Sequence, residues 1–258
     1  MEITTGTLSL TNGELFYRKT SAKSDPVLIF IHGAGGDSTV FQKQLDGLGD
    51  SYTVAAVDLP GHGNSKCDTL PDLACYRDAL ISFIESFSPA RAVISGHSMG
   101  GGIIFELANS IPEKIAGLIF LTSSPVLPVS DMIFDSIDKD FNAFCTMVTK
   151  LCYSPDVEPS VFNASVERMK NQGADCVRND FKICQNFNYM DVAGSLKIPA
   201  LIVATKYDKM VPLKLSEEFA SIMPSARLAA FDAKGHTPYI ELADAVNSEI
   251  KEFMASIK

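Results

Sequence analysis

The stretch that most constrains this chain runs from residue 92 to residue 108, where an apolar run, a glycine-flanked serine and a helical pattern follow one another. The apolar run predicts a short buried strand at 92–94, and the spacing over 99–108 predicts a helix that ends before Pro112. Between them Gly96, Ser98 and Gly100 form the pattern G-x-S-x-G. A sharp bend from strand to helix leaves no room for side chains at the two glycines and pushes the serine hydroxyl outward. The stretch therefore predicts a serine presented at the end of a strand.

The rest of the chain repeats the alternation of buried strands and helices. Continuous apolar runs predict strands at 26–31, 53–57, 117–121, 199–205 and 227–231. Helical patterns predict helices at 38–48, 71–87, 213–223 and 242–257, with Pro71 in the first turn of its helix. Alternating polarity predicts an edge hairpin formed by 7–10 and 14–18, with Asn12 and Gly13 as its turn. Together these patterns predict an α/β fold with a mostly parallel, doubly wound sheet.

The alternation breaks after residue 122. Residues 123–196 contain no strand pattern but predict two to four helices, the first running from Met132 to Val148. Because this segment is too long for a loop, we interpret it as a helical lid inserted into a core formed by residues 1–122 and 197–258. Its Phe134, Phe141 and Phe144 are candidates to line a substrate pocket, and the alternative for each is a place in the lid's own core.

Charge and cysteine content argue against several classes of function. The net charge is -9, the isoelectric point is about 4.9 and there is no basic cluster, which argues against nucleic acid or an anionic membrane as a partner. No apolar stretch has the length of a membrane helix and the N-terminus lacks a signal-peptide pattern, so we expect a cytoplasmic protein. The six cysteines have no C-x-x-C or zinc-site spacing. We expect reduced thiols and no metal, with Cys145/Cys152 and Cys176/Cys184 as the alternative disulfide pairs.

A serine hydroxyl becomes a nucleophile when an imidazole takes its proton and a carboxylate holds that imidazole in place. The chain has four histidines. His32 and His62 lie in loops that precede the serine and are expected to brace those loops, while His97 adjoins the serine on the bend, where neighbouring side chains diverge. His236 is the remaining candidate base. Asp208 is the matching carboxylate, because both residues follow a predicted strand at the same edge of the sheet as the serine.

Other polar residues have a plausible structural role. Near His236 in sequence, Asp232 is expected to be a solvated turn residue and Glu241 to begin the closing helix, so neither displaces Asp208. We expect Asp58 to cap a turn. The glycine-rich loop at 32–37 can direct backbone amides at a ligand, and the alternative is an ordinary turn between strand and helix.

These motifs occur in an order that resembles a known family, the α/β-hydrolase fold proteins with a helical cap, and the likeness covers nearly the whole chain. It implies Ser98 as nucleophile, His236 as general base and then acid, and Asp208 as the carboxylate that orients the imidazole. It also implies an oxyanion hole made by the backbone amides of Ala34 and Met99, and no metal or organic cofactor. The matching segments are His32-Gly33-Ala34-Gly35-Gly36, Gly96-His97-Ser98-Met99-Gly100, Asp208 with Val211-Pro212, and Gly235-His236.

From these residues we expect a serine hydrolase, specifically a carboxylesterase that cleaves small to medium apolar esters through an acyl-enzyme on Ser98. Gly33, Met210 and Val211 are further candidates for contact with this small-molecule substrate. A thioesterase or a carbon-carbon bond hydrolase of the same fold is an alternative, although Asp37 stands where carbon-carbon hydrolases usually carry proline. A second alternative is a ligand receptor that keeps the triad and turns over slowly, since a fold does not fix a function.

Overall fold

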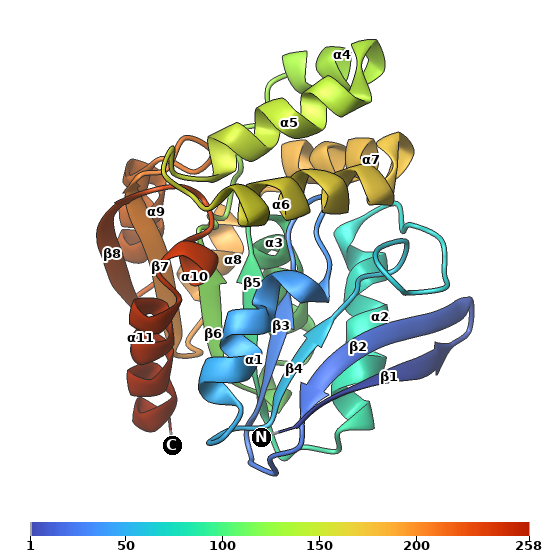
Figure 1. The fold of residues 1–258 in the computed structure, drawn as a ribbon. Helices are drawn as coiled ribbons and strands as arrows, with labels where there is room; N and C mark the ends of the chain where they lie inside the picture. Colours follow the sequence, from blue (N-terminus) through green and yellow to red (C-terminus); the bar gives the residue numbers. More distant parts are fainter. Residues whose placement is uncertain (1, 258) are drawn as a thin grey trace.

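The computed structural model of the protein describes residues 2–257, which are organised around one eight-stranded sheet (Figure 1). The strand order is β1-β2-β4-β3-β5-β6-β7-β8. The strands are β1 (Ile3–Leu10), β2 (Gly13–Thr20), β3 (Val27–Ile31), β4 (Val54–Val57), β5 (Ala92–His97), β6 (Ile115–Leu121), β7 (Ala200–Tyr207) and β8 (Ala226–Lys234). β2 pairs antiparallel with β1 and β4, and every other pair is parallel. The predicted α/β fold with a mostly parallel sheet is confirmed.

The central strands bring their carboxyl ends to one edge of the sheet. Every residue of β3, β4, β5 and β6 is buried, as expected for parallel strands covered on both faces. The parallel register pairs Ile31 with Gly96 and His97 with Leu121, so β3, β5 and β6 end side by side. This is the edge at which open α/β sheets bind ligands.

Helices cover both faces of the sheet (Figure 1). One face carries the 3-10 turn at Ser38–Phe41, α1 (Gln42–Leu48), α10 (Pro238–Glu241) and α11 (Ala243–Ser256). The other face carries α2 (Leu73–Ser86), α3 (Met99–Ser110) and α9 (Leu213–Ile222), and a second 3-10 turn at Pro112–Lys114 follows α3.

The start of α2 differs from the prediction by two residues. The Asp72 carboxylate accepts a hydrogen bond from the Cys75 amide and so caps the first turn. Pro71 therefore lies outside the helix rather than in its first turn.

The predicted edge hairpin is present, but both strands are longer than predicted and the turn is shifted by one residue. Leu10 pairs with Gly13, so the turn residues are Thr11 and Asn12 rather than Asn12 and Gly13. Gly13 has φ of 140°, and a Cβ at this position would lie 2.1 Å from the Lys66 carbonyl oxygen. The glycine is therefore required by the close approach of the segment after β4.

Residues 123–196 are helical, as predicted, but they form five helices rather than two to four. These are α4 (Met132–Lys139), α5 (Phe141–Cys152), α6 (Pro159–Gln172), α7 (Ala174–Asn186) and α8 (Met190–Ser195). The single helix predicted from Met132 to Val148 is wrong, because Asp140 has extended backbone angles and its carboxylate caps α5 by accepting the Ala143 amide. α4 to α7 lie across the carboxyl edge of the sheet, whereas α8 packs against α9 (Figure 1). The division into a core unit and a lid unit stays a prediction.

Two further features concern the described residues. All six cysteines are free thiols, so neither Cys145/Cys152 nor Cys176/Cys184 is bridged. None of the helices within residues 2–257 is both long enough and apolar enough to cross a membrane.

Candidate active site

Ser98 lies on the sharp bend between β5 and α3. Its φ of 49° and ψ of -114° place a residue with a side chain in a region that such residues rarely adopt. A Cβ at Gly96 would lie 2.4 Å from the Gly100 carbonyl oxygen, and one at Gly100 would lie 2.7 Å from the Ile31 carbonyl oxygen. Both glycines therefore have the steric role predicted for them, and the bend places Ser98 at a cavity beneath the helices of 123–196.

Asp208 and His236 follow β7 and β8 and are joined by a hydrogen bond. His236 Nδ1 lies 2.7 Å from Asp208 Oδ2, and both side chains are buried. The other carboxylate oxygen, Oδ1, accepts the backbone amides of Met210 at 2.7 Å and Val211 at 3.0 Å. Because a carboxylate oxygen only accepts, Nδ1 carries a proton, which leaves Nε2 as the ring nitrogen that can act on the serine.

Ser98 and His236 line the same cavity, which has a volume of about 60 Å³. Among the hydrogen bonds of the described residues, none joins the Ser98 hydroxyl to the His236 ring. The structure thus brings the three predicted residues to one site and joins two of them directly.

The two alternative carboxylates have other partners. Asp232 is exposed on β8 rather than in a turn, and its Oδ1 lies 3.7 Å from Lys206 Nζ. Glu241 ends α10 instead of beginning the closing helix, and it accepts a hydrogen bond from the Ser154 amide at 3.0 Å. Among the described residues, neither carboxylate forms a hydrogen bond with the His236 ring.

His97 has a role that the sequence did not indicate. Its side chain does not diverge from the site: the ring lies 4.7 Å from that of His236, and Nε2 donates to the His236 carbonyl oxygen at 3.0 Å. Thr122 Oγ1 donates to the same carbonyl at 2.7 Å. Burial, together with the positive charge that His236 can carry, holds the pKa of His97 well below its usual range. His97 is therefore a neutral support for the backbone of His236, and its place beside the serine was the only signal in the sequence.

The helices above the sheet also hold the histidine loop. The His236 amide donates to the carbonyl oxygen of Cys152, the last residue of α5, and Thr237 Oγ1 donates to that carbonyl at 3.3 Å. From below, Thr205 Oγ1 on β7 donates to the Gly235 carbonyl at 2.6 Å. The position of His236 thus depends on α5 as well as on the sheet.

The loop after β3 places the backbone amide of Ala34 at the cavity. Ala34 lines the cavity beside Ser98, and Met99 is the first residue of α3. Among the hydrogen bonds of residues 2–257, neither the Ala34 nor the Met99 amide has a protein acceptor. A free amide at a helix N-terminus and a free amide in an adjacent loop are the groups that bind a developing oxyanion.

Three residues brace the loops around the site, as predicted. His32 Nδ1 donates to the Gly33 carbonyl at 2.9 Å and Nε2 accepts the Leu59 amide at 3.0 Å. Burial, and secondarily the positive charge of His62, lowers the pKa of His32 to about 4, so the ring is neutral. His62 and Asp58 likewise hold the loop after β4, where Asp58 accepts the Ser38 and Asn64 amides at 2.7 Å each.

The cavity lining agrees only in part with the candidate pocket residues. Met210 and Val211 line the cavity at Ser98, whereas Gly33 lines a neighbouring cavity that Ala34 also lines. Phe134, Phe141 and Phe144 do not line either cavity. They belong to the apolar cluster between the helices above the sheet, because α4 and α5 turn these residues toward α7 rather than toward the sheet. The cavity is closed instead by Val148, Met169 and Phe181.

Comparison with known proteins identifies relatives over nearly the whole chain. A model of the alpha/beta hydrolase family matches residues 28–249. A pimeloyl-(acyl-carrier protein) methyl ester esterase from Vibrio campbellii is 26% identical over 245 residues, which cover 89% of this chain and 95% of the relative. An esterase of the same name from Aliivibrio fischeri is 26% identical over 261 residues, covering 93% of this chain and 97% of the relative.

Solved structures share the fold at lower sequence identity. An enol-lactonase from Burkholderia xenovorans superposes with a TM-score of 0.90 at 20% identity, covering 97% of this chain and 100% of its own. A likeness at this identity shows the arrangement of strands and helices alone.

Proposed function

The chain belongs to the alpha/beta hydrolase family, and from that premise we propose that it is a carboxylic ester hydrolase with Ser98 as its nucleophile. His236 takes the proton of the serine hydroxyl and later delivers it to the leaving group, and Asp208 fixes the tautomer of His236. The observation that supports this most strongly is the buried His236–Asp208 hydrogen bond of 2.7 Å at the cavity that also contains Ser98.

The hydrogen bonds of residues 2–257 include none between Ser98 and the His236 ring, which fits a free enzyme. A serine hydroxyl can rotate among staggered positions, and catalytic hydrogen bonds often form only when substrate occupies the site. In our proposal Ser98 Oγ turns to His236 Nε2 as the ester binds, while Asp208 and the support of His97 keep the imidazole in place.

The transition state is stabilised by the Ala34 and Met99 amides, which have no protein acceptor in the described part of the chain. As Ser98 attacks, the ester carbonyl oxygen becomes an anion between the Ala34 and Met99 amides. Each such donor contributes about 2.7–4 kcal/mol to the transition state. Water then attacks the acyl-enzyme with His236 as general base and releases the acid.

The cavity favours a small to medium apolar acyl group. Apart from the catalytic groups, its walls are mainly aliphatic, thioether and aromatic side chains. Its volume of about 60 Å³ makes a short acyl chain the best fit in this conformation. The curated relatives named above support an ester bond, since both are methyl ester esterases.

The test is Ser98→Ala, assayed with a p-nitrophenyl ester panel from acetate to palmitate. We expect kcat/KM for the preferred ester to fall by at least about 10³-fold with an unchanged circular dichroism spectrum, because no other nucleophile replaces the hydroxyl. Ser165→Ala is the matched control, since Ser165 lies on α6 and bonds the Tyr153 hydroxyl instead of facing a histidine. Activity that survives in Ser98→Ala and disappears in Ser165→Ala would overturn the assignment.

A second experiment separates the ester hydrolase from its alternatives. A thioester and a vinylogous diketone are assayed beside the ester panel, and the product is followed over many equivalents of protein. We expect the ester to give the highest kcat/KM and sustained turnover. A dominant diketone rate would identify a carbon-carbon bond hydrolase, a dominant thioester rate a thioesterase, and a single slow event per chain a receptor.

A further inference from the structure

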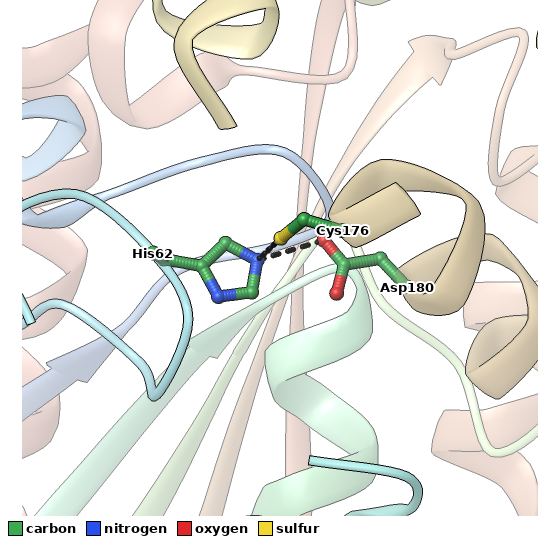
Figure 2. A group of neighbouring side chains, drawn as sticks. All are labelled: His62, Cys176 and Asp180. Carbon is green, nitrogen blue, oxygen red and sulfur yellow. Dashed lines mark hydrogen bonds and ion pairs between the residues drawn. The ribbon is translucent and has the colours of Figure 1, made fainter. Parts of the chain in front are cut away.

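A second cluster of reactive side chains lies outside the proposed triad. Figure 2 shows His62, from the loop after β4, facing Cys176 and Asp180 of α7. His62 Nε2 lies 2.9 Å from Asp180 Oδ2 and 3.2 Å from Cys176 Sγ. Cys176 and Asp180 are four residues apart and therefore share one face of the helix. The exposed fractions are 1% for His62, 6% for Cys176 and 0% for Asp180, so all three residues are buried.

The imidazole of His62 already has the orientation of a metal-bound histidine. His62 Nδ1 lies 3.0 Å from the Pro60 carbonyl oxygen. Because a carbonyl oxygen only accepts, Nδ1 carries a proton and Nε2 is the atom directed at the cysteine and the carboxylate. A hydrogen bond from the second ring nitrogen to a backbone carbonyl is the usual outer contact of a metal-bound histidine.

The carboxylate has an oxygen without a partner. Asp180 Oδ2 accepts the Gly35 amide at 2.8 Å as well as facing His62. Asp180 Oδ1 is buried and has no hydrogen-bond partner among the described residues. A buried carboxylate oxygen without a donor is costly, and a cation bound by this carboxylate would offset part of that cost.

We propose that His62, Cys176 and Asp180 bind a divalent transition-metal ion, and that Zn²⁺ is the ion that fits. Nitrogen, sulfur and carboxylate ligands together suit Zn²⁺, whereas Mg²⁺ and Ca²⁺ require oxygen ligands. The three ligand atoms lie within 4.8 Å of one another. A tetrahedral zinc site separates such atoms by about 3.4–3.6 Å. The observed 2.9 and 3.2 Å would have to open by only a few tenths of an ångström.

The occupied site would carry no net charge. The thiol proton of Cys176 leaves to solvent as the ion binds, and a thiolate, a carboxylate and a neutral imidazole around Zn²⁺ are together neutral. The interior would therefore hold no uncompensated charge.

The ion would connect the helices above the sheet to the proposed oxyanion loop. Cys176 and Asp180 belong to α7, His62 to the loop after β4, and Asp180 also holds the amide of Gly35, which follows Ala34. Zinc would thus tie α7 to both loops. The binding itself does not depend on the proposed ester hydrolysis, so it is tested without an activity assay.

The test uses the full chain, freed of metal with a chelator, and titrated with Zn²⁺ and with Co²⁺ as a spectroscopic substitute. We expect one equivalent of Zn²⁺ bound with a Kd below about 1 µM, and a thermal unfolding midpoint that rises on binding. Bound Co²⁺ should show thiolate-to-metal absorption. In Cys176→Ser this absorption disappears and the zinc affinity falls by at least about 100-fold.

The matched control is Cys184→Ser, which changes a buried cysteine two turns further along α7 that is outside the cluster. It should keep the stoichiometry, the affinity and the cobalt spectrum. Asp180→Asn replaces Cys176→Ser if the latter fails to fold. The proposal is overturned if the native chain binds no zinc, if its cobalt complex lacks thiolate absorption, or if Cys176→Ser binds as tightly as Cys184→Ser. Any of these results would leave the cluster as a hydrogen-bonded ion pair only.

Discussion

At the scale of single residues, Gly33 is the point at which the proposed oxyanion loop passes close to the serine bend. A Cβ at this position would lie 2.8 Å from His97 Nδ1, 3.0 Å from the His97 carbonyl oxygen and 3.1 Å from Ser98 Cβ. Gly33→Ala must therefore push the loop that carries Ala34 away from Ser98. We expect kcat for a short ester to fall about 10²-fold, the effect of losing one oxyanion donor, with a smaller change in KM.

The control for this prediction is Gly194→Ala, the same chemical change on α8. Its Cβ would meet only the Ile222 carbonyl oxygen, at an ordinary contact distance of 3.7 Å. In steady-state assays the kcat of Gly33→Ala should therefore be about 10²-fold lower than that of Gly194→Ala. Equal activities would show that the approach of residue 33 to the bend does not matter for catalysis.

His97 gives a prediction about pH. Its pKa in the folded protein lies well below the value of about 6.5 in an unfolded chain. As pH falls below 6.5 the unfolded chain therefore takes up a proton that the folded protein does not. The free energy of unfolding then decreases by up to about 1.4 kcal/mol per pH unit.

His97→Asn removes this titrating group. We expect the variant to have a lower free energy of unfolding than the native chain at pH 8, because the hydrogen bond to His236 is weakened. This difference in free energy should become smaller between pH 6.5 and pH 5. Urea unfolding of both proteins at several pH values measures this difference. A difference that stays constant with pH would contradict the assignment of a neutral, buried His97.

At the scale of elements, the break between α4 and α5 rests on Asp140. Its carboxylate accepts the Ala143 amide at 3.0 Å and caps α5, whose last carbonyl, at Cys152, holds the His236 amide. Asp140→Ala should lower the free energy of unfolding by about 1 kcal/mol, because a helix cap is lost. Asp140→Asn should stay within a few tenths of a kcal/mol of the native chain, since asparagine also caps. Chemical denaturation compares the two, and equal losses would show that the cap does not stabilise α5.

The same elements show what the sequence could and could not predict. The strands, the serine bend and the strand ends that carry Asp208 and His236 were predictable, because each is encoded by a local run of apolar residues or glycines. The break at Asp140 was missed, because apolar residues at helical spacing continue across it and only the capping aspartate marks it. Met210 and Val211 were predicted to line the cavity and do so, but the lining from the helices above the sheet was missed, since the pattern shows that a face is apolar but not which element covers it. Cys176 and Asp180 are four residues apart on α7, but His62 lies 114 residues before Cys176, so no spacing rule joins the three.

At the scale of the whole molecule, the proposed site exists only where the sheet meets the helices above it. The loops after β3, β5, β7 and β8 supply Ala34, Ser98, Asp208 and His236, and α5, α6 and α7 close the cavity. The loops of the sheet therefore supply the reacting groups, whereas the helices above it support His236 through α5 and form part of the cavity wall. Substitutions in the cavity wall should change which ester is preferred and leave the reaction itself in place.

Met210 is a position at which this expectation can be tested, because it lies two residues after Asp208 and lines the cavity. Met210→Ala opens room for about two more methylene groups of an acyl chain, each worth about 0.8 kcal/mol when buried. We expect the ratio of kcat/KM for octanoate to that for acetate to rise about tenfold. Met132→Ala is the control, since Met132 is 73% exposed on α4 and should leave the ratio unchanged. If the p-nitrophenyl ester panel gave the same ratio for both variants, the acyl chain would have to bind elsewhere than in the cavity at Ser98.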